Sequence, residues 1–259
     1  MVPDWPAPAG VRAVFTTRRG GVSQPPFDSF NLGHHVRDDP ASVALNRASL
    51  RAITSPAAPV FLQQVHGNHI ACLDANAPDG IEADACVVQA GTGVAATIMV
   101  ADCMPVLFAC VSGAAVAAAH AGWRSLAGGV IEATVHALRE AGSVTTPSSH
   151  GGHANIVAWL GPCIGPQAFE VGSEVVDAFV ALDAGAIECF SAQSANKFLA
   201  DLPALVRRRL QAVGVTSVWG NDGSLPWCTV SQSARFFSHR RDAVRLGSTG
   251  RMAACVWFG

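Results

Sequence analysis

Residues 114–129 read AAVAAAHAGWRSLAGG, and this run constrains the fold more than any other part of the 259-residue chain. Five of its first six residues are Ala, and the remaining one is Val116. Side chains this small and apolar predict a buried strand over 114–119, packed tightly on both faces. His120 then falls at the C-terminal end of the strand, where layered α/β proteins gather their functional groups.

The residues after this strand suggest an anion site. We interpret GWRSLAGG (122–129) as a loop whose Gly pair opens the next helix. The N-terminus of a helix offers unpaired N–H groups and a partial positive charge, and Arg124 adds a fixed fork of donors. Together they predict a cradle for phosphate or another anion.

Two other apolar runs also end in metal-ligand side chains. PVFLQQVHG (59–67) carries His66 near its end, and VAATIMVADCMPV (94–106) carries Cys103. Two imidazoles and one thiolate, with His120 as the second imidazole, suit zinc and leave a fourth position open, as in catalytic sites. Their spacing matches no short metal motif. The alternative is therefore two hydrogen-bonded core histidines and one buried thiol.

Composition excludes several classes of protein. The 17 Lys and Arg residues against 19 Asp and Glu give a net charge of −2, so we expect no nucleic-acid partner. The apolar runs are too short to span a bilayer, and the N-terminal residues lack a signal-peptide pattern, so we expect no membrane association. The eight Cys contain no CxxC pair, which is typical of reduced thiols and indicates a cytoplasmic protein.

The chain alternates short apolar runs with a few amphipathic segments. We expect strands over 12–17, 59–65, 69–73, 85–89, 94–101, 105–111, 114–119, 156–160, 217–219 and 252–258. We expect helices over 41–52, 129–141, 173–183 and 198–213. Residues 142–155, with His150 and His153, are expected to form an exposed loop. Irregular alternation predicts an α+β fold, a layered sandwich of mixed β-sheets flanked by helices, in one domain over 1–259.

Several ordered blocks resemble a known family. They are TTRRGGVS (16–23), SFNLG (29–33), QQVHG (63–67), EADA (82–85), ADCMPV (101–106), HAGWR (120–124), GPCIG (161–165) and FFSHRRD (236–242). The chain resembles the YfiH or laccase-domain family, also called multicopper polyphenol oxidases and now described as purine nucleoside phosphorylases. The match runs from about residue 12 to the C-terminus.

The resemblance implies a fold related to the toxin-like cysteine hydrolases and a catalytic zinc on His66, Cys103 and His120. It also implies phosphorolysis of adenosine, inosine and methylthioadenosine with phosphate, together with deamination of adenosine. Copper is the alternative metal under the older family label. The partners would be a nucleoside and phosphate.

Other residues of these blocks are candidates for substrate binding, each with a structural alternative. Phosphate could be held by Arg18 or its neighbour Arg19, by Arg124 and by Arg240, or these could be solvated side chains. We expect Arg240 and Arg241 on a loop, with one of them paired with Asp242. Asn31 could bind a hydroxyl or form a turn. Gln64 faces the same side of its strand as His66. Asp84 could orient a zinc ligand or shuttle protons, and Cys163 could line the pocket or be inert. Asp102 is expected to be structural.

Three other functions use the same residues. Cys103 and His120 could form a nucleophile and base, as in a cysteine hydrolase or an amidase that edits cell-wall precursors. A polyphenol oxidase would need more histidines around several metals than nine His with no HxH pair suggest. A metal-binding scaffold without turnover is the third alternative.

Overall fold

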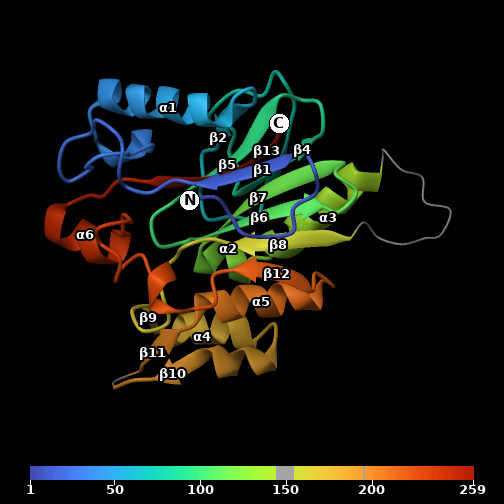
Figure 1. Cartoon of the computed structure of the whole chain (residues 1–259). Coiled ribbons are helices and arrows are strands. Elements are labelled where there is room, and N and C mark those ends of the chain that lie inside the picture. The colour runs from blue at the N-terminus through green and yellow to red at the C-terminus, as the bar shows by residue number, and fades with distance from the viewer. Residues whose placement is uncertain (144–154, 195) are drawn as a thin grey trace.

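The computed structural model describes residues 1–143, 155–194 and 196–259, and it has four layers (Figure 1). Most of the predicted loop at 142–155, including His150 and His153, lies outside the described residues. The two central layers are β-sheets that pack face to face, and helices cover their outer faces. The predicted α+β sandwich of mixed sheets is confirmed.

The first sheet has the strand order β1-β13-β5-β2. It is mixed, because β2 is parallel to β5 whereas β1, β13 and β5 pair antiparallel. Its strands are β1 (Val11–Phe15), β13 (Met252–Phe258), β5 (Val94–Val100) and β2 (Ala58–Phe61).

The second sheet has the order β12-β8-β6-β7-β4-β3 and is parallel only at its two edges. Its strands are β12 (Ser217–Gly220), β8 (Ile156–Leu160), β6 (Met104–Cys110), β7 (Ala115–Ala121), β4 (Ala85–Gln89) and β3 (Ile70–Leu73). A third, small sheet has the order β10-β11-β9, with β9 at Glu170–Gly172, β10 at Phe190–Ala192 and β11 at Lys197–Ala200.

Strand β7 shows why the Ala-rich run was informative. All seven of its residues are buried, and successive side chains enter different cores. Ala117 and Ala119 face the helical layer, whereas Val116 and Ala118 face the first sheet. His120 has the parity of Val116 and Ala118, so the alternation of a strand directs its side chain toward the space between the sheets.

Helices close both outer faces. Helix α1 (Pro40–Thr54) covers the first sheet, where Leu50 packs with the outward side chains of β5 and β13. Asp39 caps α1 by accepting the N–H groups of Ala41 and Ser42. The second sheet is covered by α2 (Trp123–Ala127), α3 (Val130–Ser143), α4 (Ser173–Val180) and α5 (Leu202–Ala212).

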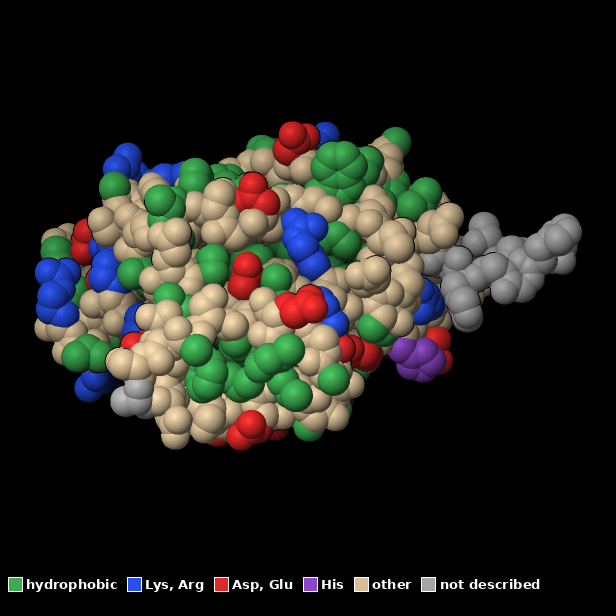
Figure 2. All heavy atoms as spheres, turned by 90° about the horizontal axis from the view of Figure 1, so that it is seen from below, with side chains coloured by type: hydrophobic (Ala, Val, Ile, Leu, Met, Phe, Trp, Pro, Cys, Tyr) green, Lys and Arg blue, Asp and Glu red, His purple; other side chains and the backbone are tan. Residues whose placement is uncertain are grey.

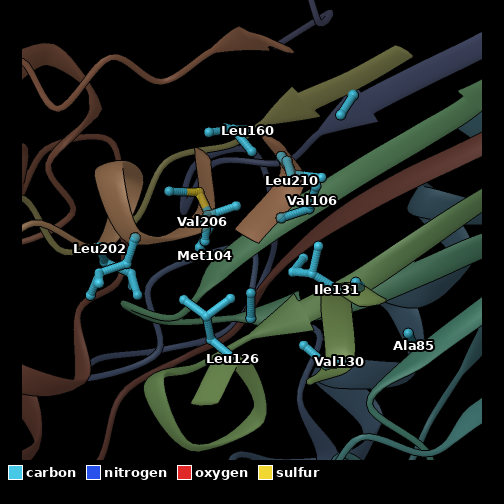
Figure 3. Close-up of a cluster of buried hydrophobic side chains, with 14 of the residues drawn as sticks. Ala85, Met104, Val106, Leu126, Val130, Ile131, Leu160, Leu202, Val206 and Leu210 are labelled. Atoms are coloured by element: carbon cyan, nitrogen blue, oxygen red, sulfur yellow. The ribbon is translucent and has the colours of Figure 1, made fainter. Parts of the chain in front are cut away.

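Figure 3 shows this helical core in detail. Leu202, Val206 and Leu210 come from α5, and Leu126, Val130 and Ile131 come from α2 and α3. They meet Met104, Val106 and Leu160 of the second sheet, and all nine side chains are almost completely buried. Alternate alanines of β7 belong to the same core, which therefore fixes β6, the strand after Cys103, and β7, the strand that carries His120.

Sequence patterns missed several elements. Residues 198–200 belong to β11 rather than to the predicted helix over 198–213, which begins only at Leu202, after the Asp201 cap. The short strands β9 and β10 lack a clear alternation and were not predicted. Short 3₁₀ helices occupy His34–Val36, Ala184–Cys189 and Leu225–Trp227. Helix α6 (His239–Leu246) replaces the loop expected around Arg240, because Ser238 caps its N-terminus and Gly247 ends it at φ 78°.

Figure 2 shows the molecule from below, and on this face acidic and basic side chains are dispersed among hydrophobic and neutral ones. This pattern agrees with a chain of small net charge. In the ranges 1–143, 155–194 and 196–259, no helix combines the length and the apolar character needed to cross a membrane.

Candidate functional site

The three predicted metal ligands meet where the chain crosses from one sheet to the other. Strand β5 belongs to the first sheet and β6 to the second, so residues 101–103 form the crossover between them. His120 pairs with Pro105 in the β6–β7 ladder, which places it beside the start of β6. His66 follows β2, the neighbour of β5. The topology thus brings three segments distant in sequence to one edge of the sandwich.

The ligand atoms are within coordination reach of one another. One ligand atom from each of His66, Cys103 and His120 lies within 4.8 Å of the other two. The Sγ atom of Cys103 is 3.6 Å from Nε2 of His66. The two imidazole rings are tilted by 68°, with centroids 4.7 Å apart. His120 is buried, Cys103 is partly exposed and His66 is exposed, so the group opens to solvent on one side.

Asp84 holds two of these ligands in place. Its side chain is fully buried, and its Oδ1 lies 2.8 Å from Nδ1 of His120. The same carboxylate accepts the backbone N–H groups of Val65, His66 and Gly67 at 2.6–3.2 Å. Because Nδ1 of His120 is engaged, Nε2 is left for an ion. Asp84 does not line the cavity, and its contacts are with the ring of His120 and the backbone of residues 65–67.

The turn carrying His66 explains why a carboxylate is needed there. His66 has a φ of 61°, a left-handed backbone conformation that residues other than Gly adopt at a cost in free energy. Three consecutive N–H groups in this turn point at one carboxylate. Asp84 therefore stabilises an otherwise unfavourable turn and orients His120 at the same time.

The electrostatics favour a thiolate. Burial alone would raise the pKa of Cys103, but the charges and hydrogen bonds of His120 and His66 outweigh it and lower the pKa to about 6. Burial also disfavours the charged form of His120, yet the Cys103 thiolate and the hydrogen bond that His120 donates to Asp84 raise its pKa to about 9. Without a metal ion, the two groups thus form a thiolate–imidazolium pair. A metal ion binds the thiolate and the neutral imidazole, so its binding would displace the proton from His120.

Gly122 leaves the room that the ligands occupy. A Cβ atom at this position would lie 2.8 Å from Cδ2 of His66 and 2.9 Å from Sγ of Cys103. Its φ is −66°, so other residues could adopt the backbone conformation. The glycine of HAGW is required by the approach of the two ligands and not by backbone strain.

A cavity of about 660 Å³ opens directly onto the three ligands. Met99, Ile164, Phe169 and Leu202 line it with apolar surface. Three arginines also line it, Arg124, Arg240 and Arg251. A volume of this order, with an apolar lining and a few convergent polar groups, is typical of small-molecule sites.

Arg124 lines the cavity as expected, but its surroundings differ from the prediction. Residues 123–127 form helix α2 rather than a loop, and the guanidinium carbon lies 4.3 Å from the centre of the Trp123 ring. Gly128 and Gly129 do not line the cavity, so the start of α3 does not complete the predicted anion cradle.

Arg240 lines the cavity from the first turn of α6, and Asp102 fixes that turn. Oδ2 of Asp102 accepts the backbone N–H of Arg240 at 2.6 Å and the hydroxyl of Ser238 at 3.1 Å. The Arg240 guanidinium donates to the carbonyls of Ala168 and Glu170. Arg241 forms the ion pair with Asp242 at 2.7 Å, one of the two arrangements expected for this doublet.

Arg18 and Cys163 do not line the cavity. Arg18 is largely occupied, since its guanidinium donates to the carbonyls of Asp28 and Ser233 and pairs with the Asp28 carboxylate at 3.2 Å. With Arg19 it borders a separate hollow of about 360 Å³. Cys163 is fully buried, and its burial raises its thiol pKa well above the usual value. The structure does not bring Arg18 or Cys163 to the metal ligands.

Two further candidates have polar groups that are already paired. Gln64 lines the cavity, but its amide exchanges two 2.8 Å hydrogen bonds with the backbone of Met99. It therefore extends the pairing between the β2 segment and β5. Asn31 is fully buried and binds the backbone of Gly33 and Arg251.

Sequence reasoning missed three cavity residues with charge or ligand chemistry, His35, His239 and Arg251. Arg251 precedes β13, whose first residue pairs with the last residue of β5. Its position beside Cys103 therefore depends on a strand pairing between distant segments. His35 is the second residue after the FNLG block, which is the available signal.

These features agree with those of a single family. The family model for multi-copper polyphenol oxidoreductase laccases matches residues 12–259, and the chain belongs to this family. The purine nucleoside phosphorylase PA4543 of Pseudomonas aeruginosa is 51% identical over 100% of this chain and 98% of its own. The purine nucleoside phosphorylase YfiH of Escherichia coli is 46% identical with the same coverage.

A solved structure shows the same fold. The Neisseria meningitidis protein NMB0706, of the DUF152 family, covers 100% of this chain and 98% of its own, with a TM-score of 0.87 and 43% identity. The resemblance drawn from the sequence blocks is confirmed.

Proposed function

We propose that this chain, acting as one domain over 1–259, is a zinc-dependent purine nucleoside phosphorylase. The observation that carries the proposal is the convergence of His66, Cys103 and His120 at a cavity lined by arginines. Relatives at 51% and 46% identity over nearly their whole length are named purine nucleoside phosphorylases. The activity of those relatives and the chemistry of this site point in the same direction.

The residues fit zinc. Two imidazoles and one thiolate are zinc donors, and a set of three leaves one coordination position for catalysis. The Asp84 carboxylate on Nδ1 of His120 is the outer support that zinc histidines need. Bound there, zinc would supply a Lewis acid and lower the pKa of coordinated oxygen groups. Copper, the metal in the family's name, is the alternative at the same ligands.

The cavity suits a nucleoside and an oxyanion together. Met99 and Phe169 offer apolar surface for a purine, and the arginines offer donors for phosphate. Phosphorolysis joins a phosphate oxygen to the anomeric carbon as the bond to the base nitrogen breaks, which yields the free purine and ribose 1-phosphate. The arginines hold the attacking oxyanion, and the enclosed apolar wall limits access of competing water.

Adenosine, inosine and methylthioadenosine are the substrates we propose, with deamination of adenosine as a side activity. The test is incubation of the zinc-loaded protein with each nucleoside, with and without phosphate, and chromatography of the products. Phosphate-dependent release of purine base, lost in Cys103→Ala with the circular dichroism spectrum retained, is the expected result. Full turnover by Cys103→Ala would contradict the proposal.

A thiol hydrolase or amidase is the second candidate, and one observation favours it. The lowered pKa of Cys103 and its 3.6 Å distance from His66 are also features of a nucleophilic cysteine. Alkylation by iodoacetamide separates the two. Stoichiometric zinc that protects Cys103 supports the phosphorylase, whereas hydrolysis of an amide by the zinc-free protein, abolished by alkylation, supports the hydrolase.

A further inference from the structure

The cavity places more positive than negative side chains around the metal ligands. Arg124, Arg240 and Arg251 line it, whereas Asp102 is its only acidic lining residue among those that the structure describes. Asp102 is already saturated by the hydroxyls of Thr229 and Ser238 and the N–H of Arg240. The cavity therefore favours an anionic ligand, and the question is which arginine binds it.

Arg124 and Arg251 both keep free guanidinium donors in the described part of the chain, and Arg251 holds them in the more buried setting. It is half-buried, whereas Arg124 and Arg240 are exposed. Its Nη1 donates to the carbonyls of Thr249 and Gly250, but Nε and Nη2 have no hydrogen-bond partner in the described part of the chain. These two nitrogens form the edge of the guanidinium that binds an oxyanion with two parallel hydrogen bonds.

The other two arginines are less suited to be the primary anchor. Both terminal nitrogens of the Arg240 guanidinium already donate hydrogen bonds to the carbonyls of Ala168 and Glu170. Arg124 lies against the Trp123 ring, exposed to water that screens its charge. Arg251 is also close enough to Cys103 and Asp102 for both to raise its pKa against the lowering effect of burial. Arg251 lines the same cavity as His66, Cys103 and His120.

Asn31 and Gly33 hold Arg251 in this position. The Oδ1 atom of Asn31 accepts the backbone N–H of Arg251 at 2.8 Å and that of Gly33 at 2.9 Å. The arginine side chain then packs over Gly33, where a Cβ atom would lie 2.8 Å from its Cγ. The FNLG block thus serves as a platform for an arginine 220 residues away.

We propose that Arg251 is the primary binding residue for the phosphate co-substrate, and that Asn31 and Gly33 are positioning residues that aim its guanidinium at the metal site. The inference rests on the proposed function, since it assigns the phosphate subsite of the same cavity. Two N–H groups of Arg251 would hold two oxygens of the phosphate, which leaves a third oxygen for the sugar.

The primary test is the kinetics of zinc-loaded Arg251→Gln with inosine and phosphate. We expect the KM for phosphate to rise at least about tenfold, because the substitution removes a charged hydrogen-bonding group. Zinc content and the KM for inosine should change little. The KM for phosphate of Arg251→Lys should lie between those of the wild type and Arg251→Gln, because Lys keeps the charge and loses the two parallel N–H groups. Arg245→Gln is the matched control, since Arg245 is exposed on α6 and outside the cavity.

Gly33→Ala tests the positioning without removing any functional group. Position 33 has a φ of −87°, so Ala fits the backbone, but its methyl group would displace the Arg251 side chain. We expect a rise in the KM for phosphate in Gly33→Ala, and no additional rise when it is combined with Arg251→Gln. Independent, additive effects would overturn the positioning role. This variant also keeps the test decisive if Arg251→Gln does not fold.

Direct binding separates this inference from the proposed function. Calorimetry of the zinc-loaded protein with inorganic phosphate should show binding that Arg251→Gln loses and Arg245→Gln keeps. If phosphate binds through Arg251 but no base is released, the inference stands and the proposed function fails. If base is released and Arg251→Gln keeps the wild-type KM for phosphate, the inference fails alone. Binding through Arg251 of adenosine monophosphate but not of inorganic phosphate would also overturn it, because the arginine would then bind a phosphate ester of the substrate.

Discussion

Asp84 and Asp102 are both buried carboxylates close to His66, Cys103 and His120, yet they bind different segments. Asp84 accepts the N–H groups of residues 65–67 and holds His120, so it acts on two of the three ligands. Asp102 adjoins the third ligand, Cys103, but binds Thr229, Ser238 and the N–H of Arg240. One carboxylate shapes the metal group and the other fixes the wall formed by α6.

The backbone at the two sites sharpens this contrast. The segment bound by Asp84 contains His66 at a φ of 61°, and Asp102 itself has a φ of 87°. The left-handed turn at Asp102 directs its side chain toward α6 while Cys103 faces the cavity. Two buried carboxylates therefore stabilise two unfavourable turns, and the difference lies in what each turn carries. The comparison predicts that metal affinity depends on Asp84 and substrate binding on Asp102.

The largest effect is expected from Asp84→Asn. An Asn side chain would turn an N–H₂ group toward donors that now meet only carboxylate oxygens, and it would weaken the orientation of His120. We expect zinc affinity to fall by about 10–100-fold, with catalytic turnover falling in parallel. Competition with a chromophoric chelator measures the affinity. Wild-type affinity in this variant would show that Asp84 is only a core residue.

Asp102→Asn should have a smaller effect, of a different kind. The amide would leave the N–H of Arg240 or the hydroxyl of Ser238 without an acceptor, at a cost of about 1–3 kcal/mol in the free energy of unfolding. We expect KM values to rise, because α6 loses its anchor, while zinc content stays at one per chain. Urea unfolding and metal analysis on the same preparation check both parts. Loss of zinc in this variant would erase the distinction between the two carboxylates.

Gly122→Ala tests the ligand side of the comparison through space alone. The added methyl group would lie under 3 Å from His66 and Cys103 in a backbone conformation that Ala adopts freely. We expect about a tenfold loss of zinc affinity, because the methyl group would displace the two ligands as much as the loss of a hydrogen-bond partner behind a ligand does. The secondary structure should be unchanged. Equal effects of Gly122→Ala and of Gly113→Ala, a turn glycine remote from the site, would contradict this assignment.

The smallest effect is a pH dependence on the α6 side. Burial alone would raise the pKa of Asp242, but hydrogen bonding and charge from Arg241 lower it below its usual value. A lowered pKa in the folded state stabilises the protein above the unfolded pKa of about 4, and the stabilisation is lost as pH falls through the folded value. We expect Asp242→Asn to reduce the free energy of unfolding by about 1–2 kcal/mol at pH 7 and by less near pH 3. Denaturant titrations at both pH values measure the difference, and a constant difference would contradict the expectation.

The sequence predicts the strands of the two large sheets well, because these strands are apolar and bounded by turn residues. Strands β4, β8 and β13 begin and end where expected. The Ala-rich run correctly predicts a strand, β7, that is buried at every position. The amphipathic patterns predict helices α1 and α3 within a few residues.

Other elements depend on contacts that local patterns do not carry. Helix α6 begins at a Ser cap and is held by Asp102, a residue 138 positions away from Arg240. Arg251 reaches the site only through the pairing of β13 with β5 and through Asn31. The convergence of His66, Cys103 and His120 could be predicted because each of them lies at or near the end of an apolar run. The residues that position these side chains could not, because their partners lie on other sheets and loops.

The most direct measurement of the central claim is X-ray absorption spectroscopy at the metal edge of the purified, zinc-loaded protein. One sulfur near 2.3 Å and two imidazole nitrogens at about 2.0–2.1 Å, with one further light ligand, are the result expected for His66, Cys103 and His120. The sulfur contribution should disappear in Cys103→Ala. A metal bound without any sulfur ligand in the wild type would contradict the account.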